Sequence, residues 1–370
     1  MRLEVIRRVY VDCAERLDPP GWLRNPRLHA DTSCMRPSFR LALVLLSAAC
    51  LLVAAAAAPR PTATAGGVCG KLEAIVVNGV TMCTHGGDDA LATTETGTRH
   101  APASRAQTPP APCAGNGRTG RRIHVLLGYP SDTPMPDATT ARPLIKQVIA
   151  MADKNLDAQS SERGQHYRFW CKRDRSVTIS KVALAPIGVD VTYTFDDVMS
   201  SLAASGFDRA QFVYSVFVAN IDCCYAYGGQ GSLAVDDRPN PTSNANNGAF
   251  ARYSMIRFNA AFSASGLARV WQHETGHNLG AVQNSAPHAS GGFHCYEEFD
   301  VMCYDDGGSY FAGGGGLVDN CPSQSADGQY AFDCNGDDYY NVDPANGSYL
   351  ADHWNLADSR WLTPVGKTVH

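Results

Sequence analysis

The feature that most constrains this chain is the segment 273–280, which reads His-Glu-Thr-Gly-His-Asn-Leu-Gly. On a helix, His273 and His277 are one turn apart, so both imidazoles leave the same face and can hold one Zn²⁺. Glu274 lies beside them and can take a proton from a water molecule that the metal activates. Gly280 stands where a helix can end in a left-handed turn. The segment predicts a helix with two zinc ligands and a general base; the alternative is an amphipathic helix with two uninvolved histidines.

Residues downstream extend this pattern. Met302 and Tyr304 follow in the sequence D-V-M-C-Y. Together with H-E-x-x-H-x-x-G, they resemble the metzincin metallopeptidases. The resemblance implies that His273 and His277 bind zinc and that Glu274 is the general base. It also implies that Met302 forms a turn beneath the metal and that Tyr304 lies near it, where its hydroxyl could donate a hydrogen bond to an oxyanion.

The third zinc ligand is where the sequence departs from this family. Metzincins usually have His or Asp three residues after the glycine, and here that residue is Gln283. An amide oxygen is a poor zinc ligand beside imidazole or carboxylate. We expect His288 to return to the metal as the third ligand, with His294 and then Gln283 as alternatives. Each histidine could instead be an ordinary surface-loop residue.

The cysteine content is typical of an exported protein. The chain of 370 residues has 13 cysteines and a formal net charge of −5, so no basic field indicates a nucleic-acid partner. Three cysteines lie in or before the apolar run 41–58, and the remaining ten can form up to five disulfides. Three pairings are close enough in sequence to predict: Cys69–Cys83, Cys295–Cys303 and Cys321–Cys334.

The N-terminal part of the sequence predicts export. Residues 35–58 have a basic start and an apolar run that ends in small residues, as in a secretory signal peptide. A single membrane anchor is the alternative. Met35 stands where an initiator would belong, so we expect residues 1–34 to be a mis-assigned upstream extension.

Residues 59–120 are rich in Ala, Thr, Pro and Gly and predict a pro-region or linker. Asn78-Gly79 between two apolar runs is typical of a hairpin, which a Cys69–Cys83 disulfide would close. The alternative is that Cys83 caps the zinc as a thiolate, because some metzincins keep their precursors inactive in this way.

Residues 121–370 predict one catalytic domain with an α+β fold. The resemblance implies a twisted mixed sheet with helices in an upper subdomain, above a loop-rich, disulfide-bonded lower subdomain. The hydrophobic patterns predict strands at 122–129, 166–171, 176–184, 211–220 and 251–259, and helices at 141–160, 194–207, from about Ser265 through the histidines, and at 348–362.

A cluster of acidic and amide residues occurs near the C-terminus. Asp333, Asn335, Asp337 and Asp338 are close in sequence, and such residues can bind Ca²⁺. The glutamate of an EF-hand loop is missing, so a solvated acidic turn is the expected structure, with calcium as the alternative.

Together these patterns predict a secreted, monomeric zinc metalloendopeptidase that acts on protein or peptide substrates. No stable membrane association is expected after signal cleavage. The alternative is a catalytically inactive extracellular binding protein with the same fold, because Gln283 could leave the zinc site too weak to fill.

Overall fold

The computed structural model describes residues 69, 72–77, 79–88, 110–160, 164–188, 193–321 and 330–364, all within one unit, Ala63–His370. The expected signal peptide and the upstream extension lie outside these residues. Among the helices described, none has the length and hydrophobicity needed to cross a bilayer.

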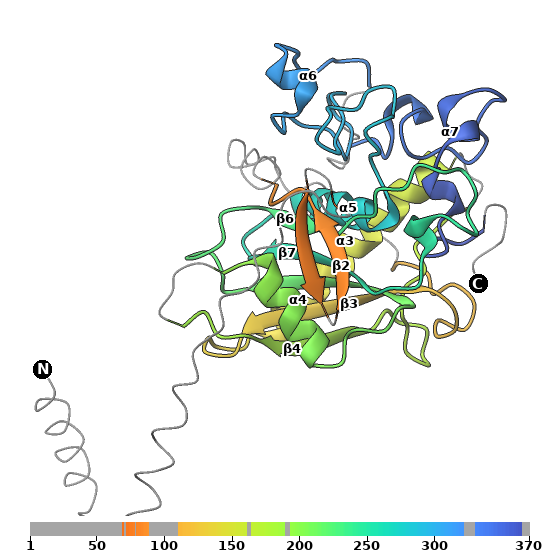
Figure 1. The fold of residues 1–370 in the computed structure, drawn as a ribbon. Coiled ribbons are helices and arrows are strands. Elements are labelled where there is room, and N and C mark those ends of the chain that lie inside the picture. The colour runs from red at the N-terminus through yellow and green to blue at the C-terminus, as the bar shows by residue number, and fades with distance from the viewer. Residues whose placement is uncertain are drawn as a thin grey trace, which may run out of the picture. The chain divides into compact units, whose positions relative to one another are not determined.

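A twisted mixed sheet of five strands forms the centre of the molecule, in the order β4-β3-β5-β7-β6 (Figure 1). The first four strands are parallel, and the short edge strand β6 runs antiparallel to β7. Their bounds are β3 (Arg122–Pro130), β4 (Ile179–Leu184), β5 (Phe212–Ala219), β6 (Gly229–Gly231) and β7 (Arg252–Phe258). β5 is buried along its whole length, which explains its unbroken apolar sequence.

Helices cover both faces of this sheet. α3 (Ala138–Gln159) and α5 (Ala264–Leu279) share one hydrophobic core with alternate residues of β3, such as Val125. α4 (Phe195–Ala204) packs on the opposite face with Leu126. The α+β prediction with a twisted mixed sheet is therefore confirmed.

Side-chain caps define the first residues of α4 and α5. Thr194 caps α4 as expected, in a capping box with Asp197. The helix that carries the histidines begins slightly earlier than expected, because Ser263 rather than Ser265 accepts the N–H of Gly266.

The predicted hairpin is present and lies against the sheet domain. β1 (Glu73–Val77) pairs antiparallel with β2 (Val80–Thr84), and Gly79 at the turn has a φ of +77°. Ile75, Val77 and Met82 share a hydrophobic core with α4. Figure 1 shows the two strands (orange) across the front of the domain.

The C-terminal third contains short elements joined by loops, drawn in blue in Figure 1. They are α6 (Ser309–Ala312), η2 (Cys334–Gly336), α7 (Tyr349–Asp352) and η3 (Leu356–Asp358); η1 (Ala245–Asn247) precedes β7. The helix predicted at 348–362 is therefore only two short turns. Trp354 and Trp361 are buried, as expected for core residues.

One predicted strand is wrong, and one observed strand was not predicted. Residues 166–171 form isolated bridges instead of a strand, with Tyr167 pairing to Leu362 and Phe169 to Ile123. The edge strand β6 was missed because two of its three residues are glycines, which weaken any strand pattern.

All ten cysteines in the described region form disulfides, and the three predicted pairs are present. The other two pairs are Cys113–Cys171 and Cys223–Cys224. Cys83 is therefore a disulfide cysteine and not a free thiolate. Because Ala111 and Cys113 are buried in the core, the folded domain begins before the expected boundary at residue 121.

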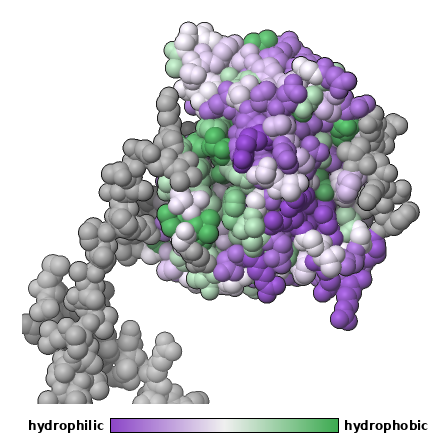
Figure 2. Space-filling view, turned by 45° about the vertical axis from the view of Figure 1, so that its right-hand side comes forward, coloured by the Kyte–Doolittle hydropathy of each residue, from purple (hydrophilic) through white to green (hydrophobic). Residues whose placement is uncertain are grey.

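The visible surface is mostly hydrophilic, and hydrophobic residues form small separate areas on it (Figure 2). The large hydrophobic side chains exposed in the described region are Val76, Val80, Met135, Tyr227, Val235, Leu317 and Val318. Leu317 and Val318 are neighbours in sequence, and Val76 and Val80 lie on the two paired strands of the hairpin. The others are separate from one another in sequence, and single exposed hydrophobic residues are common on protein surfaces.

Candidate metal centre

The helix α5 positions the first part of the site. It ends at Gly280, whose φ of +103° is the left-handed conformation expected at this position. A Cβ atom at Gly276 would lie 2.7 Å from Sδ of Met302, so only glycine allows this close approach. Met302 therefore lies directly against the helix that carries the histidines.

Three imidazoles converge at the C-terminal end of α5. The Nε2 atoms of His273 and His277 are 3.1 Å apart, and each lies 3.2 or 3.1 Å from Nε2 of His294. Nitrogen ligands bound tetrahedrally to a metal at about 2.0–2.1 Å are separated by roughly this distance. The three side chains are thus arranged as one metal-binding set.

The second nitrogen of each ring is held by a hydrogen bond. Such bonds orient a ligand ring and fix the proton on Nδ1, which leaves Nε2 for a metal. The acceptors are the carbonyl oxygen of Val301 for His273 (2.8 Å), that of Ala281 for His277 (2.8 Å), and Oδ2 of Asp306 for His294 (2.9 Å).

The structure brings His294, and not His288, to the first two histidines. Nδ1 of His288 lies 3.2 Å from Oδ1 of Asp338, in a different cluster. Gln283 donates its amide to the carbonyl oxygens of Gly280 and Ala234, so it is not directed at the metal position. The preferred assignment of His288 therefore does not agree with the geometry.

The sequence does contain an indication that His294 is the third imidazole of the site. It precedes Cys295, and the Cys295–Cys303 disulfide ties this residue to the turn that contains Met302. The spacing of the family pattern alone cannot find it, because the loop between Gly280 and His294 is longer than in that pattern.

Glu274 lies on the same helix, fully buried, with no hydrogen-bond partner for either carboxylate oxygen in the described structure. The edge strand leaves room for it: a Cβ atom at Gly229 would lie 2.4 Å from Oε1 of Glu274. Burial, and then the nearby charge of Asp88, raise the pKa of Glu274 well above its usual value. A carboxylate with a raised pKa is suited to accept and return a proton near neutral pH.

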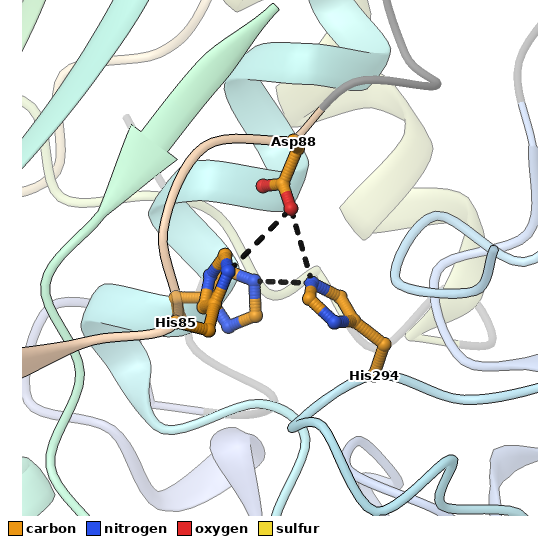
Figure 3. Close-up of side chains that lie close together, drawn as sticks. His85, Asp88 and His294 are labelled. Carbon is orange, nitrogen blue, oxygen red and sulfur yellow. Dashed lines mark hydrogen bonds and ion pairs between the residues drawn. The ribbon is translucent and has the colours of Figure 1, made fainter. Parts of the chain in front are cut away.

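Two residues after the hairpin complete the centre, and the sequence analysis missed them. Oδ2 of Asp88 is 3.2 Å from Nε2 of His273, and Oδ1 is 3.4 Å from Nε2 of His294. The ring of His85 lies against His277, with centroids 4.2 Å apart. Figure 3 shows Asp88 directed toward His85 and His294. Only tertiary structure could reveal this, because nearly 200 residues separate the two parts of the site.

Tyr304 also reaches the centre. Its hydroxyl donates a hydrogen bond to Asp88, and its ring centroid is 4.5 Å from that of His294. Tyr304, His85, His294 and Asp306 line a cavity of about 490 Å³, one wall of which is formed by hairpin residues such as Glu73.

The chain after β2 runs antiparallel beside β6. The N–H of Leu233 donates to the carbonyl oxygen of Cys83 at 2.9 Å. Further along, the N–H of Gly228 donates to the carbonyl oxygen of Asp88 at 2.9 Å, and the N–H of Asp88 donates to Gly229 at 3.2 Å. Segment 83–88 therefore extends the sheet at its β6 edge, next to the histidines.

Burial and the nearby carboxylates shift the pKa values of the histidines in opposite directions. Burial, and then the neighbouring histidines, lower the pKa of His277 well below its usual value, so this ring is neutral and can bind a metal. Burial also acts to lower the pKa of His294, but hydrogen bonds to Asp306 and Asp88 outweigh it and raise the pKa to about 9. A metal ion bound at Nε2 of His294 would have to displace a proton from this ring.

Comparisons with known proteins do not assign this chain. No protein-family model and no curated protein matches the sequence. The crystal structure of wild-type OgpA from Akkermansia muciniphila is similar over 56% of this chain and 60% of that chain, with 11% identity and a TM-score of 0.30. A similarity at this level carries no inference, so the function must be inferred from the geometry of the site.

Proposed function

We propose that this chain is a zinc-dependent metalloendopeptidase of the metzincin type, made as a latent precursor. The observation that carries the proposal is the convergence of three Nε2 atoms beside the buried carboxylate of Glu274. Three protein ligands with a further position beside them are typical of catalytic zinc, whereas structural zinc sites have four protein ligands.

The residues present suit zinc. His273, His277 and His294 are imidazole donors with fixed rings, and zinc favours nitrogen ligands in a tetrahedral arrangement. When bound, zinc would lower the pKa of a water molecule towards about 7 and polarise a substrate carbonyl.

The chain's own residues supply the remaining chemistry. Glu274 removes a proton from the attacking water and delivers it to the leaving amine. The hydroxyl of Tyr304 donates to the developing oxyanion once Asp88 has left, which is worth about 3–4 kcal/mol for comparable donors. Met302 takes no part in the chemistry and supports the helix beneath the ligands.

A peptide substrate is favoured by the segment that occupies the site. Segment 83–88 pairs in an antiparallel manner with the edge at 228–233 at both of its ends, through Cys83 and Asp88. Pairing of this kind is a general mode of peptide recognition by sheet edges. A substrate peptide would replace this segment and place its scissile carbonyl where Asp88 now lies.

The same geometry supports latency. The carboxylate of Asp88 lies against Nε2 of His273 and of His294, and Tyr304 donates to that carboxylate, so Asp88 occupies space beside the atoms that would hold zinc. We therefore infer that segment 83–88 excludes both water and substrate until it is removed.

Export is supported by the disulfides, because such bonds persist in oxidising compartments. The proposal thus places the enzyme outside the cell.

The first test measures zinc and casein hydrolysis together. A chain that begins at residue 110 is produced in an oxidising compartment, and hydrolysis is measured with and without a chelator. We expect His294→Ala to lose the catalytic zinc and all chelator-sensitive hydrolysis, because two imidazoles hold zinc far more weakly than three. His288→Ala should retain this activity.

The rival function is an inactive binding protein. It predicts a well-folded wild type without zinc at the three histidines and without hydrolysis. That result would remove the peptidase proposal.

A second prediction concerns the close approach of β6 to the general base. In Gly229→Ala the new methyl group would displace the carboxylate of Glu274, since the ideal Cβ position is 2.4 Å from Oε1. A misplacement of about 1 Å can cost roughly a hundredfold in rate. We expect this loss in kcat with unchanged zinc content. Gly316→Ala is the control, because its Cβ meets nothing within 4 Å. Full activity of Gly229→Ala would argue against Glu274 as the base.

A further inference from the structure

A second cluster of ionisable side chains lies outside the three-histidine centre. His288, Glu297, Asp337 and Asp338 each offer one ligand atom, and these atoms all lie within 4.8 Å of one another. Nδ1 of His288 is 3.2 Å from Oδ1 of Asp338 and 3.7 Å from both Oε1 of Glu297 and Oδ1 of Asp337. Three carboxylates thus surround one imidazole.

Two of these carboxylates are buried, and among the described residues each has one oxygen atom without a partner. The other oxygen accepts a hydrogen bond from Asn335 in Glu297 and from the N–H of His288 in Asp338. The side chains of Glu297 and Asp338 are 0% exposed. Oε2 of Glu297 and Oδ2 of Asp338 have no hydrogen-bond partner in the described structure. Within the described part of the chain, no Lys or Arg pairs with either group, and the imidazole of His288 is the basic side chain beside them. Buried carboxylates in this state are costly unless a cation or a proton joins them.

The same burial raises the pKa values of both carboxyl groups. Burial, and then the charge of Asp338, raise the pKa of Glu297 to about 7. Burial, and then the charge of Asp300, raise the pKa of Asp338 to about 7. Two buried carboxylates at this separation repel each other, and a shared proton or metal ion would relieve that repulsion.

We propose that His288, Glu297, Asp337 and Asp338 bind a second divalent metal ion of the zinc type. One imidazole nitrogen and three carboxylate oxygens are within the ligand preferences of zinc, whereas calcium takes oxygen ligands. The unpartnered oxygens of Glu297 and Asp338 are the atoms that the ion would satisfy. This proposal is independent of the peptidase proposal.

The ligand set differs from the calcium cluster considered from the sequence. Asp333 accepts backbone N–H groups from Asp338, Tyr339 and Tyr340, so it is a structural residue within its own loop. Asp333 and Asp338 are both buried, which contradicts the expectation of a solvated acidic turn. His288 and Glu297, distant in sequence, supply the missing half of the site.

The position of the site gives it a structural consequence. The N–H of Tyr296 donates to the carbonyl oxygen of His288 at 3.1 Å, and Ala289 forms a bridge with Cys295. His288 and Glu297 therefore flank the base of the loop that carries His294. An ion bound here would join that base to the segment 337–338 and hold His294 in register.

The test counts metal ions in the full-length chain. Protein is loaded with ZnCl₂, desalted, and analysed for zinc by mass spectrometry. We expect about two zinc ions per wild-type chain and about one in Glu297→Gln/Asp338→Asn, because the amides remove the two buried charges. Asp352→Asn, an exposed control, should keep both ions. His277→Ala should lose the ion at the three histidines and keep the other.

The outcomes separate the two metal proposals. A wild type with about one zinc, lost in His277→Ala, would overturn the second site and leave the first. If the double variant does not fold, His288→Gln replaces it, because the side chain of His288 is 22% exposed and its substitution should disturb the fold less. We expect about one zinc ion per chain in this variant as well. An unchanged zinc count in either folded variant overturns the proposal. So does calcium binding that survives His288→Gln, because the imidazole would then not be a ligand.

Discussion

Glu274→Gln is expected to lower peptide hydrolysis by about 10²–10⁴-fold, the usual contribution of a general acid–base residue. The amide cannot accept the proton of the attacking water, but its shape is nearly that of the carboxylate. Because Glu274 is not one of the three imidazole ligands, zinc content should stay at the wild-type level. The measurement is kcat/KM on a quenched peptide, with metal analysis of the same sample.

Glu298→Gln is the matched control, since it removes the same charge at a half-buried position on the loop beyond the site. It should leave both hydrolysis and zinc unchanged. Near-normal hydrolysis by Glu274→Gln would eliminate Glu274 as the base, and loss of zinc in that variant would mean that its carboxylate has a structural part in the centre.

Asp88→Asn should activate the uncleaved precursor by roughly ten- to hundredfold. The substitution removes a charged acceptor that contacts His273, His294 and Tyr304. Hydrogen bonds to a charged group are worth about 1.5–3 kcal/mol, which corresponds to this range. Hydrolysis is measured on full-length chain whose intact mass is checked before and after the assay.

Asp319→Asn, an exposed change in the same charge, is the control and should remain as inactive as wild type. Chain that begins at residue 110 gives the upper limit of activity. If wild type and Asp88→Asn hydrolyse the peptide equally before any cleavage, Asp88 does not block the site.

Patterns among residues close in sequence were sufficient to predict several helices and strands and part of the site. The apolar run of β5, the cap at Thr194 and the Gly280 turn each depend on neighbours in sequence, so their pattern is sufficient. The same holds for His273 and Glu274, whose geometry follows from one helix.

The remainder depends on contacts between distant segments. His294 reaches the other imidazoles through a long loop, and His288 was preferred because sequence distance was the available guide. Asp88 lies close to His273 only because the hairpin packs on the sheet edge. The glycines of β6 carry no strand pattern at all, although they make room for Glu274.

The Cys69–Cys83 disulfide lies wholly within the hairpin, and none of the disulfides among the described residues joins the hairpin to the rest of the domain, so the two are linked through the backbone between Asp88 and Pro110. While that link is intact, segment 83–88 competes with substrate within the same molecule, so dilution of the protein does not weaken its competition. After one backbone cut, the cross-linked hairpin becomes a separate molecule that can dissociate. The fraction of sites that it occupies then falls as the protein is diluted, so in the proposed secreted enzyme dilution after the cut would free the site.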